Sequence, residues 1–511
     1  MWCGHCSLLN CSSTSPNPFP QQRCQSSNNP IHVFWPLPDD QPGTVCNRTL
    51  IGSFAKAVSF TDCRKTYLRA KTKKDELVPS LNLGRVAPQL CSVLNCDRYT
   101  PLILVFPLLS ILALTAPISM SAQESWPRFR GSDGSGISPA TNVPVRWAEG
   151  DVRWKTKLPG KGHSSPVVWK ERVFVTSGDI TNADRHILCV ASEDGNLMWQ
   201  KKYASHIFQQ NRENSFGTAT PAVDPNGVYM SWTTPETITV IALTLDGHER
   251  WVSNLGPFKG RHGSGASPVV YNGLVWINND QDGPSSLIAL KADSGAVSYK
   301  IDRLTDKVSY GTPCLWQEAG HPDQLIFASS SHGLTSVNPL NGAINWDCTN
   351  LFEARVVSSP ISGDGLIICS SGEGGVGRRL VALCPPDGTH AFRIVYDLKT
   401  GIPNVPTPLA KDGRLYILCD NGLLRCVRAA TGEPIWQERL PARFYASPVW
   451  AENRLYLTSK AGEVFVVAAG DKYQLLAQNT LGEPSFATPA VANGSLFFRT
   501  ESSLFAIGGH K

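Results

Sequence analysis

Positively charged side chains recur in one sequence context, a few residues before a Ser-Pro or Thr-Pro pair. If these loops converge in the fold, their cations would focus a positive potential on an anionic ligand or an acidic partner. Two of the residues are histidines, which serve as ligands, acids or bases. Glu213 and Glu483 oppose them. The candidate binding residues are Lys161, His163, Arg212, Arg261, His262, Lys307, Arg355 and Arg443.

No catalytic motif accompanies these residues. The sequence has no Gly-x-Ser-x-Gly, and no Cys-x-x-Cys-His stands out. The Gly-rich run Gly372–Gly377 lies between two expected strands of one sheet, so we interpret it as a flexible loop and not as a dinucleotide site. The seven cysteines after residue 100 lack metal-site spacing. We therefore assign no catalytic residue, no metal ligand and no cofactor from motifs.

The Ser/Thr-Pro pairs mark a repeat, and the repeat must position the candidate residues. Each unit reads as four short strands, with a Gly-containing turn before the last. The prolines recur every 40 to 55 residues, the period of propeller blades. Proline suits an innermost strand, because its missing N–H falls on the edge facing the channel. The pairs begin at Ser165, Thr220, Ser267, Thr312, Ser359, Thr407, Ser447 and Thr488.

The last strand of most units carries an aromatic residue just after its turn. A large ring on the outermost strand can fill the wedge between neighbouring blades, and its burial contributes about 2 to 3 kcal/mol. The seventh unit departs from the pattern, since its turn leads to Leu475. The expected wedge residues are Trp199, Trp251, Tyr299, Trp346, Phe392 and Trp436.

The two ends of the repeat region indicate the number of blades. The eighth unit stops after three strands, while an unpaired fourth strand, around Trp154, precedes the first. Pairing the two closes the ring and leaves no exposed edge. The sequence thus predicts an all-β, eight-bladed β-propeller of four-stranded antiparallel blades over 151–508.

These repeats resemble those of the pyrroloquinoline-quinone-type propellers. That group includes the quinoprotein dehydrogenases and the outer-membrane assembly lipoprotein that shares their eight-bladed fold. The lead-in Trp126-Pro127-Arg128-Phe129-Arg130-Gly131 is also similar to the start of secreted planctomycete repeat proteins of this type. The resemblance covers about residues 126–508. It implies the fold, while the activity must be argued from a site.

The chain before the repeats divides into three parts. Residues 1–100 read as a disordered or wrongly assigned extension. Residues 101–122 resemble a secretory signal segment, with an uncleaved membrane anchor as the alternative. Residues 123–150 form a lead-in loop anchored by Trp126. These features predict a periplasmic or secreted protein, whose membrane contact is limited to an uncleaved apolar segment.

The charge distribution argues against a nucleic-acid partner, and the cysteines read as structural residues. The net charge of +5 comes from residues 1–122, with eleven Lys and Arg against six Asp and Glu. The repeat region is balanced and offers no basic stripe for nucleic acid. Cys189, Cys384 and Cys426 are expected to be buried apolar residues, and a disulfide between Cys419 and Cys426 remains open.

Three functional hypotheses follow. The first is a non-catalytic, monomeric scaffold that binds a protein or peptide through its loop faces, including the long connection from Lys202 to Thr218. The second is a quinone-dependent dehydrogenase of small alcohols or sugars, which would need pyrroloquinoline quinone and calcium. The third is a carbohydrate-binding propeller, in which Trp232, Trp276, Trp316 and Tyr445 stack on sugars.

Overall fold

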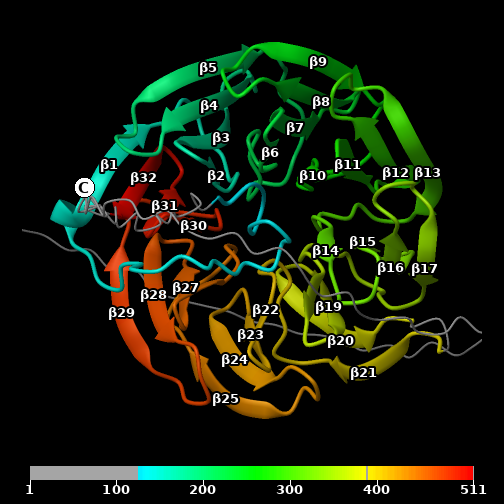
Figure 1. Ribbon diagram of the computed structural model, residues 1–511, viewed down its shortest axis with the longest axis vertical. Helices are drawn as coiled ribbons and strands as arrows, with labels where there is room; N and C mark the ends of the chain where they lie inside the picture. Colours follow the sequence, from blue (N-terminus) through cyan, green and yellow to red (C-terminus); the bar gives the residue numbers. More distant parts are fainter. Residues whose placement is uncertain (1–124, 387–389, 510–511) are drawn as a thin grey trace, which may run out of the picture. The chain divides into compact units, whose positions relative to one another are not determined.

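Eight four-stranded antiparallel sheets form a ring around a central channel (Figure 1). The computed structural model describes residues 125–386 and 390–509, and the expectations for 1–122 lie outside them. Within these ranges the helical structure is the short 3-10 helix η1 (Glu149–Asp151). The predicted all-β, eight-bladed propeller is confirmed.

Each blade runs from a three-residue strand at the channel to an outer strand. The first four blades are β2 (Val167–Trp169), β3 (Arg172–Gly178), β4 (Arg185–Ala191), β5 (Leu197–Tyr203); β6 (Ala222–Asp224), β7 (Gly227–Thr233), β8 (Ile238–Leu243), β9 (Glu249–Asn254); β10 (Val269–Tyr271), β11 (Leu274–Asn279), β12 (Gly283–Lys291), β13 (Val297–Thr305); and β14 (Cys314–Trp316), β15 (Gln324–Ser329), β16 (Gly333–Val337), β17 (Ile344–Cys348).

The last four blades continue the same order. They are β18 (Ile361–Gly363), β19 (Leu366–Glu373), β20 (Val376–Cys384), β21 (Arg393–Leu398); β22 (Leu409–Lys411), β23 (Arg414–Leu418), β24 (Leu423–Arg428), β25 (Pro434–Arg439); β26 (Val449–Ala451), β27 (Arg454–Thr458), β28 (Glu463–Ala468), β29 (Leu475–Thr480); and β30 (Ala490–Ala492), β31 (Ser495–Arg499), β32 (Ser503–Gly508) with β1 (Val152–Lys157).

The N-terminal strand closes the ring, as the sequence predicts. β1 pairs antiparallel with β32, with Trp154 opposite Ala506 and Thr156 opposite Leu504. The eighth blade therefore joins residues from both ends of the repeat region, and β1 covers the edge of β32 without a second chain.

Aromatic residues on the outer strands lie against the turn of the following blade. The Trp154 Nε1–H donates to the Ser192 carbonyl at 3.0 Å, and that of Trp199 donates to the Leu245 carbonyl at 2.9 Å. In the fifth blade the prediction that Phe392 fills the wedge between blades is wrong. It is 37% exposed, and Tyr396 contacts the next turn instead, at Gly432. The cause is register, because Tyr396 pairs with Ala382 as Trp199 pairs with Cys189.

The turn glycines serve these aromatic residues as well as the turns. Gly247 has φ +84°, and a Cβ there would lie 2.6 Å from Cδ2 of Trp199. We predict that Gly247→Ala lowers the free energy of unfolding by about 2 to 3 kcal/mol, because strain and overpacking add. Gly320→Ala is the matched control, since Gly320 has the same φ of +84° with nothing within 4 Å of its would-be Cβ. Equal losses in denaturant titrations of both variants would contradict the packing role.

The Ser and Thr residues of the repeat link the blades around the channel. The backbone N–H of each one donates to the side-chain hydroxyl of its counterpart in the next blade, from Ser165 to Thr220 through Ser447 to Thr488. The seven N···O distances are 2.9 to 3.2 Å. The role of the proline in each pair was predictable from the sequence, whereas that of the hydroxyl was not.

The cysteines of the propeller are unpaired thiols. All seven cysteines of the described ranges are free, so no disulfide joins Cys419 and Cys426, and Cys384 is only half-buried. Burial raises the pKa of the Cys189 thiol to about 12, which keeps it neutral.

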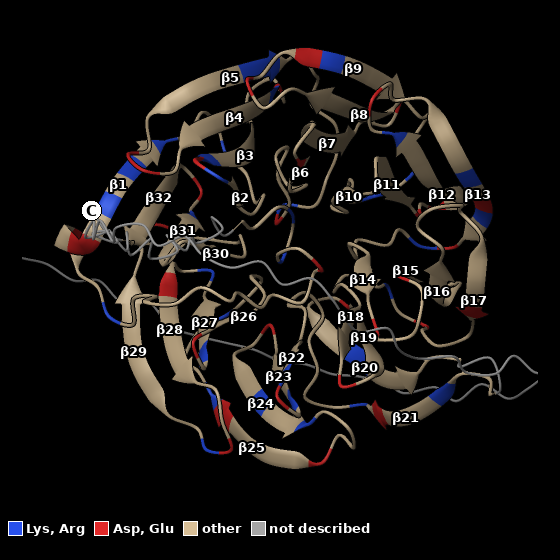
Figure 2. Ribbon diagram, in the orientation of Figure 1, with Lys and Arg blue, Asp and Glu red and all other residues tan. Residues whose placement is uncertain are grey.

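Figure 2 shows Lys and Arg interspersed with Asp and Glu around the outer strands. Over the described residues, no helix has the length and apolar character needed to cross a bilayer.

Candidate functional site

The lead-in, residues 125–147, crosses the channel and plugs it; we call it the plug. It bonds to the channel-facing edges of innermost strands that proline was expected to leave free. Trp126 exchanges two backbone hydrogen bonds with Val168, and Gly136 and Ser138 bond to Trp450 across the ring. Between these two contacts, the Asp133 carbonyl accepts the Leu315 N–H of β14, so the plug reaches the first, fourth and seventh blades. The prediction of a loop anchored by Trp126 missed this path.

Two buried arginines fix the plug. Arg128 donates to the Pro313 carbonyl at 3.1 Å. Arg130 donates to the carbonyls of Pro408 at 2.9 Å and Pro448 at 3.0 Å. Burial lowers the pKa of Arg130 to about 9, so the guanidinium stays charged at neutral pH. The prolines of the repeat therefore supply the carbonyls that hold the plug.

Above the plug the channel opens into a cavity of about 900 Å³, which we call the cup. Phe129 of the plug lines it, as do all eight Ser and Thr residues of the ring. Its wall comes from the loops before these residues and from turns between second and third strands. The cup contains Phe129, His163, Asn211, Arg212, Glu213, His262, Tyr310, Arg355, Glu373, Asn404, Asp420, Asn421, Arg443, Tyr445, Lys460 and Phe486 among its lining residues.

Five of the eight candidate binding residues line the cup: His163, Arg212, His262, Arg355 and Arg443. The other three lie outside its lining. Lys161 pairs with Glu501 at 2.9 Å, and Lys307 donates to the Glu353 carbonyl at 2.7 Å. Arg261 is exposed outside the cup.

The two cup histidines do not contribute positive charge. Burial, together with Arg499, Lys161 and Lys460, lowers the pKa of His163 to about 3. Burial and the nearby Arg355 also lower the pKa of His262. Both rings are therefore neutral at physiological pH, and the positive charge of the cup comes from its arginines and a lysine.

The neutral His163 makes stability pH-dependent. The unfolded chain protonates this imidazole below pH 6.5 while the folded protein does not, so folding is penalised progressively from pH 6.5 down towards pH 3. The slope is at most ~1.4 kcal/mol per pH unit. We predict that His163→Gln loses less stability than the unsubstituted protein between pH 7 and pH 4, measured by urea unfolding. Parallel pH profiles for the two proteins would refute the buried neutral imidazole.

Lys460 is the cup residue that sequence reasoning missed most clearly. It follows β27, not a loop before a Ser/Thr-Pro pair. Its ammonium lies 4.2 Å from the Tyr445 ring centroid and 5.0 Å from that of Phe486. It also forms an ion pair with Glu213, which lies on the long connection between β5 and β6. Lys460 lies in the turn between the second and third strands of its blade, as Asp420 and Asn421 do in the sixth blade. Polar residues recurring in this turn were the sequence signal that could have identified the position.

The other two carboxylates of the cup are also engaged. The Asp420 Oδ2 accepts the Asn404 N–H at 2.7 Å, and burial raises the pKa of Asp420. Glu373 lies 3.8 Å from Arg355. Glu373 belongs to the Gly-rich run, which forms a tight hairpin between β19 and β20 and lines the cup instead of forming a loose loop.

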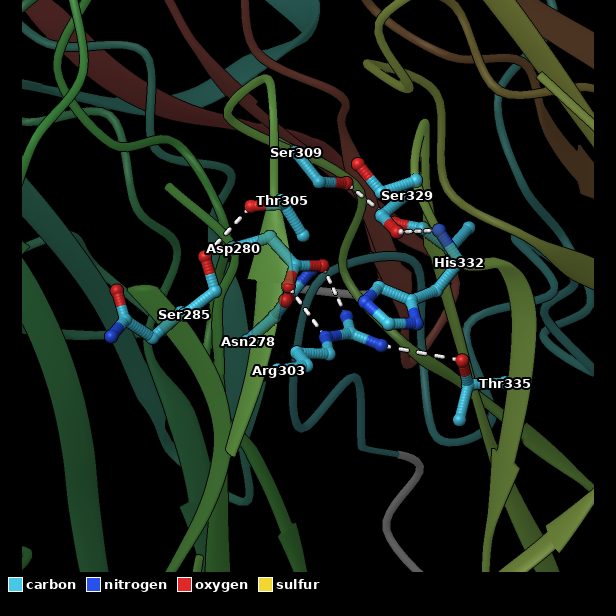
Figure 3. Close-up of polar contacts among 12 residues, drawn as sticks. Asn278, Asp280, Ser285, Arg303, Thr305, Ser309, Ser329, His332 and Thr335 are labelled. Atoms are coloured by element: carbon cyan, nitrogen blue, oxygen red, sulfur yellow. Dashed lines mark hydrogen bonds and ion pairs between the residues drawn. The ribbon is translucent and has the colours of Figure 1, made fainter. Parts of the chain in front are cut away.

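A second polar cluster joins the third and fourth blades away from the cup. Figure 3 shows Arg303 of β13 facing Asp280 and reaching Thr335 of β16. The Arg303 Nε donates to the Asp280 Oδ1 at 2.6 Å, and the two side chains are 5% and 0% exposed. Burial raises the pKa of Asp280 and the guanidinium offsets part of that rise. With both groups paired and enclosed, the cluster is built for stability.

Pyrroloquinoline quinone with calcium is the group that the quinoprotein resemblance implies. Calcium takes six to eight oxygen ligands, whereas among the described residues the cup has three buried side-chain oxygens without a protein partner, on Tyr310, Asn404 and Asp420. Among the described residues, no group of three or more His, Cys, Asp or Glu is placed to hold a metal ion. The residues that line the cup therefore do not fit a calcium site, and we derive no chemistry through calcium.

Most of the aromatic residues considered for sugar stacking are packed inside the protein and do not face a binding surface. Trp276 is fully buried and Trp316 is 3% exposed, both within the core between blades. Trp232 packs on Tyr203 at 5.3 Å between ring centroids. Tyr445 alone among the four lines the cup. Stacking of sugars on Trp276 and Trp316 is therefore wrong.

Solved structures share this architecture. BamB from Moraxella catarrhalis aligns with a TM-score of 0.50 at 14% identity, covering 70% of this chain and 97% of that one. A europium-containing methanol dehydrogenase aligns with a TM-score of 0.56 at 12% identity, covering 74% and 90%. At these identities the likeness shows the fold alone.

Sequence comparison is more specific. Outer membrane protein assembly factor BamB of Yersinia pestis is 23% identical over 215 residues, which are 39% of this chain and about half, 53%, of that relative. The family model described as outer membrane protein assembly factor BamB matches residues 141–261, 184–382 and 376–480. These matches cover most of the ring, and the chain therefore belongs to this family of quinoprotein-like, BamB-type propellers.

Proposed function

We propose that this protein is a non-catalytic binding propeller that takes an extended segment of a partner protein into the cup. The observation that carries the proposal is the shape of the channel. The plug and the Ser/Thr ring close one end, while the other end opens over about 900 Å³. A cavity of this size accepts a few residues of a peptide, and flexible partner segments commonly bind in such sites.

The lining supports a peptide over an apolar small molecule. Hydroxyls floor the cup, and Arg212, Arg355 and Arg443 bring positive charge to its wall. The side chain of Arg443 is exposed and has no hydrogen bond or ion pair within the described ranges. With Lys460 these arginines are four cations against the three carboxylates of Glu213, Glu373 and Asp420, and an excess of positive charge raises the local concentration of acidic segments.

The family supports the place of action. The relative's name describes a factor for outer membrane protein assembly. We propose that this chain likewise works in the cell envelope, as a single chain that contacts a protein and not nucleic acid.

Site-specific photo-crosslinking tests the proposal. A photoreactive residue at Asn421, which is exposed and lines the cup, is expected to crosslink a partner protein in living cells. The same residue at Gln200, exposed on the outer strand β5, is the control. Crosslinking from Gln200 but not from Asn421 would move the binding surface to the outer wall and refute the cup.

The dehydrogenase alternative is tested separately with the purified full chain. Pyrroloquinoline quinone and calcium are titrated while absorbance and melting temperature are followed together. We expect no saturable binding and no shift in melting temperature. A saturable rise in melting temperature would show a ligand of the folded state and favour the dehydrogenase.

A further inference from the structure

We propose that Lys460 and its two aromatic neighbours form a carboxylate-binding subsite, and that Glu213 occupies it until a ligand carboxylate takes its place. This inference rests on the proposed function, because it names the group of the partner segment that the cup recognises. It also makes Glu213 an internal competitor of that segment.

The contacts at Lys460 define the subsite. Its ammonium forms an ion pair with the Glu213 carboxylate, and the side chains are 21% and 32% exposed. The rings of Tyr445 and Phe486 flank it, and they are packed on each other at 5.8 Å between centroids. His163 stacks on Phe486 at 4.6 Å and is neutral, so it adds no competing charge. One cation is thus held in a partly apolar frame.

The origin of Glu213 indicates that it is a replaceable occupant. Glu213 lies on the connection 204–221 between the first two blades, while Lys460 belongs to the seventh. The pair joins groups 247 residues apart across the cup. Arg212 lies 3.6 Å from the same carboxylate but is 92% exposed, so it remains near Glu213 without burying it. With 21% and 32% of the two side chains exposed, the ion pair stays in contact with solvent, and a ligand carboxylate can exchange for that of Glu213.

The frame favours a carboxylate on an aliphatic stem. An ammonium offers three donors to one anionic group, and the two rings give the stem an apolar contact. Both a glutamate side chain and a C-terminal carboxylate provide this chemistry. Arg443 also lines the cup, and its side chain has no partner among the described residues, so it can receive a second carboxylate of the same segment.

The test uses the purified full chain and two fluorescent probe peptides. One is a hexaglutamate peptide acetylated and amidated at its ends. The other is a neutral Gly-Ser peptide with a free carboxyl end. We expect Glu213→Gln to bind the matching probe roughly five- to tenfold more tightly, because the internal competitor is lost. Lys460→Gln should lose at least the same factor, and Lys460→Arg should recover most of it.

Glu501→Gln is the matched control. Glu501 pairs with Lys161 at 2.9 Å outside the cup lining, so its loss removes an ion pair without freeing Lys460. Preference for hexaglutamate assigns the subsite to a side chain, and preference for the free carboxyl end assigns it to a C-terminus. Unchanged affinities in both Glu213→Gln and Lys460→Gln would overturn the subsite. If Asn421 still crosslinks a partner in that case, the cup remains a binding site and only the carboxylate assignment fails.

Discussion

Replacing Arg130 with Met should lower the free energy of unfolding by roughly 3 to 5 kcal/mol. The guanidinium donates to four carbonyls, those of Gly134 and Ser135 in the plug and those of Pro408 and Pro448 in two blades. Methionine fills similar space but leaves these carbonyls without donors inside a closed channel. Each orphaned carbonyl costs about 1 to 3 kcal/mol if it stays buried, so local opening of the plug will limit the total.

Denaturant unfolding at neutral pH measures this loss. Arg146→Met is the control, because Arg146 lies on the same segment but is exposed. Limited proteolysis should also cut the plug faster in Arg130→Met than in the control. Equal stability of the two variants would mean that the plug is held by its backbone bonds alone.

Asp280→Ala should be about as costly, at roughly 3 to 5 kcal/mol. The substitution leaves the guanidinium of Arg303 without its counter-ion where the side chain is 5% exposed. Because Arg303 also donates to Thr335 at 3.2 Å, the third and fourth blades lose part of their connection.

An exposed ion pair on β13 serves as a control that distinguishes the effect of burial on stability from that of losing a charge. Lys300 and Asp302 of β13 are 2.7 Å apart with side chains 53% and 74% exposed, so Asp302→Ala should change stability by less than about 1 kcal/mol. The double variant Asp280→Ala with Arg303→Met should recover much of the loss, since no buried charge remains unpaired. A double variant as unstable as Asp280→Ala would show that packing, not the unpaired charge, sets the cost.

The fold could be predicted because its signals are local and repeated. Ser/Thr-Pro pairs and Gly-containing turns recur in each unit, so one misread unit does not change the architecture. The closure by β1 followed from counting strands, since a strand around Trp154 was in excess and one was missing after Ile507. Phe392 was misjudged because a sequence gives the turn but not the pairing register that places Tyr396 on the wedge.

The cup was only partly predictable, because its key contacts join residues far apart in the chain. The loops before the Ser/Thr-Pro pairs were identifiable, and they supply Arg355 and Arg443. Lys460 belongs to a different class of turn, and its pairing with Glu213 depends on ring closure and on the path of the 204–221 connection. The low pKa of His163 is caused first by burial and then by Arg499, a residue of the eighth blade that ring closure brings beside the first.

The most direct test of the cup is a crystal structure of the full chain with whichever of the two probe peptides binds more tightly. The account predicts a carboxylate of that peptide at about 3 Å from the Lys460 Nζ, with Glu213 moved off the ammonium and Phe129 of the plug still beneath the ligand. A peptide bound on the outer strands, with Glu213 still paired to Lys460, would contradict it.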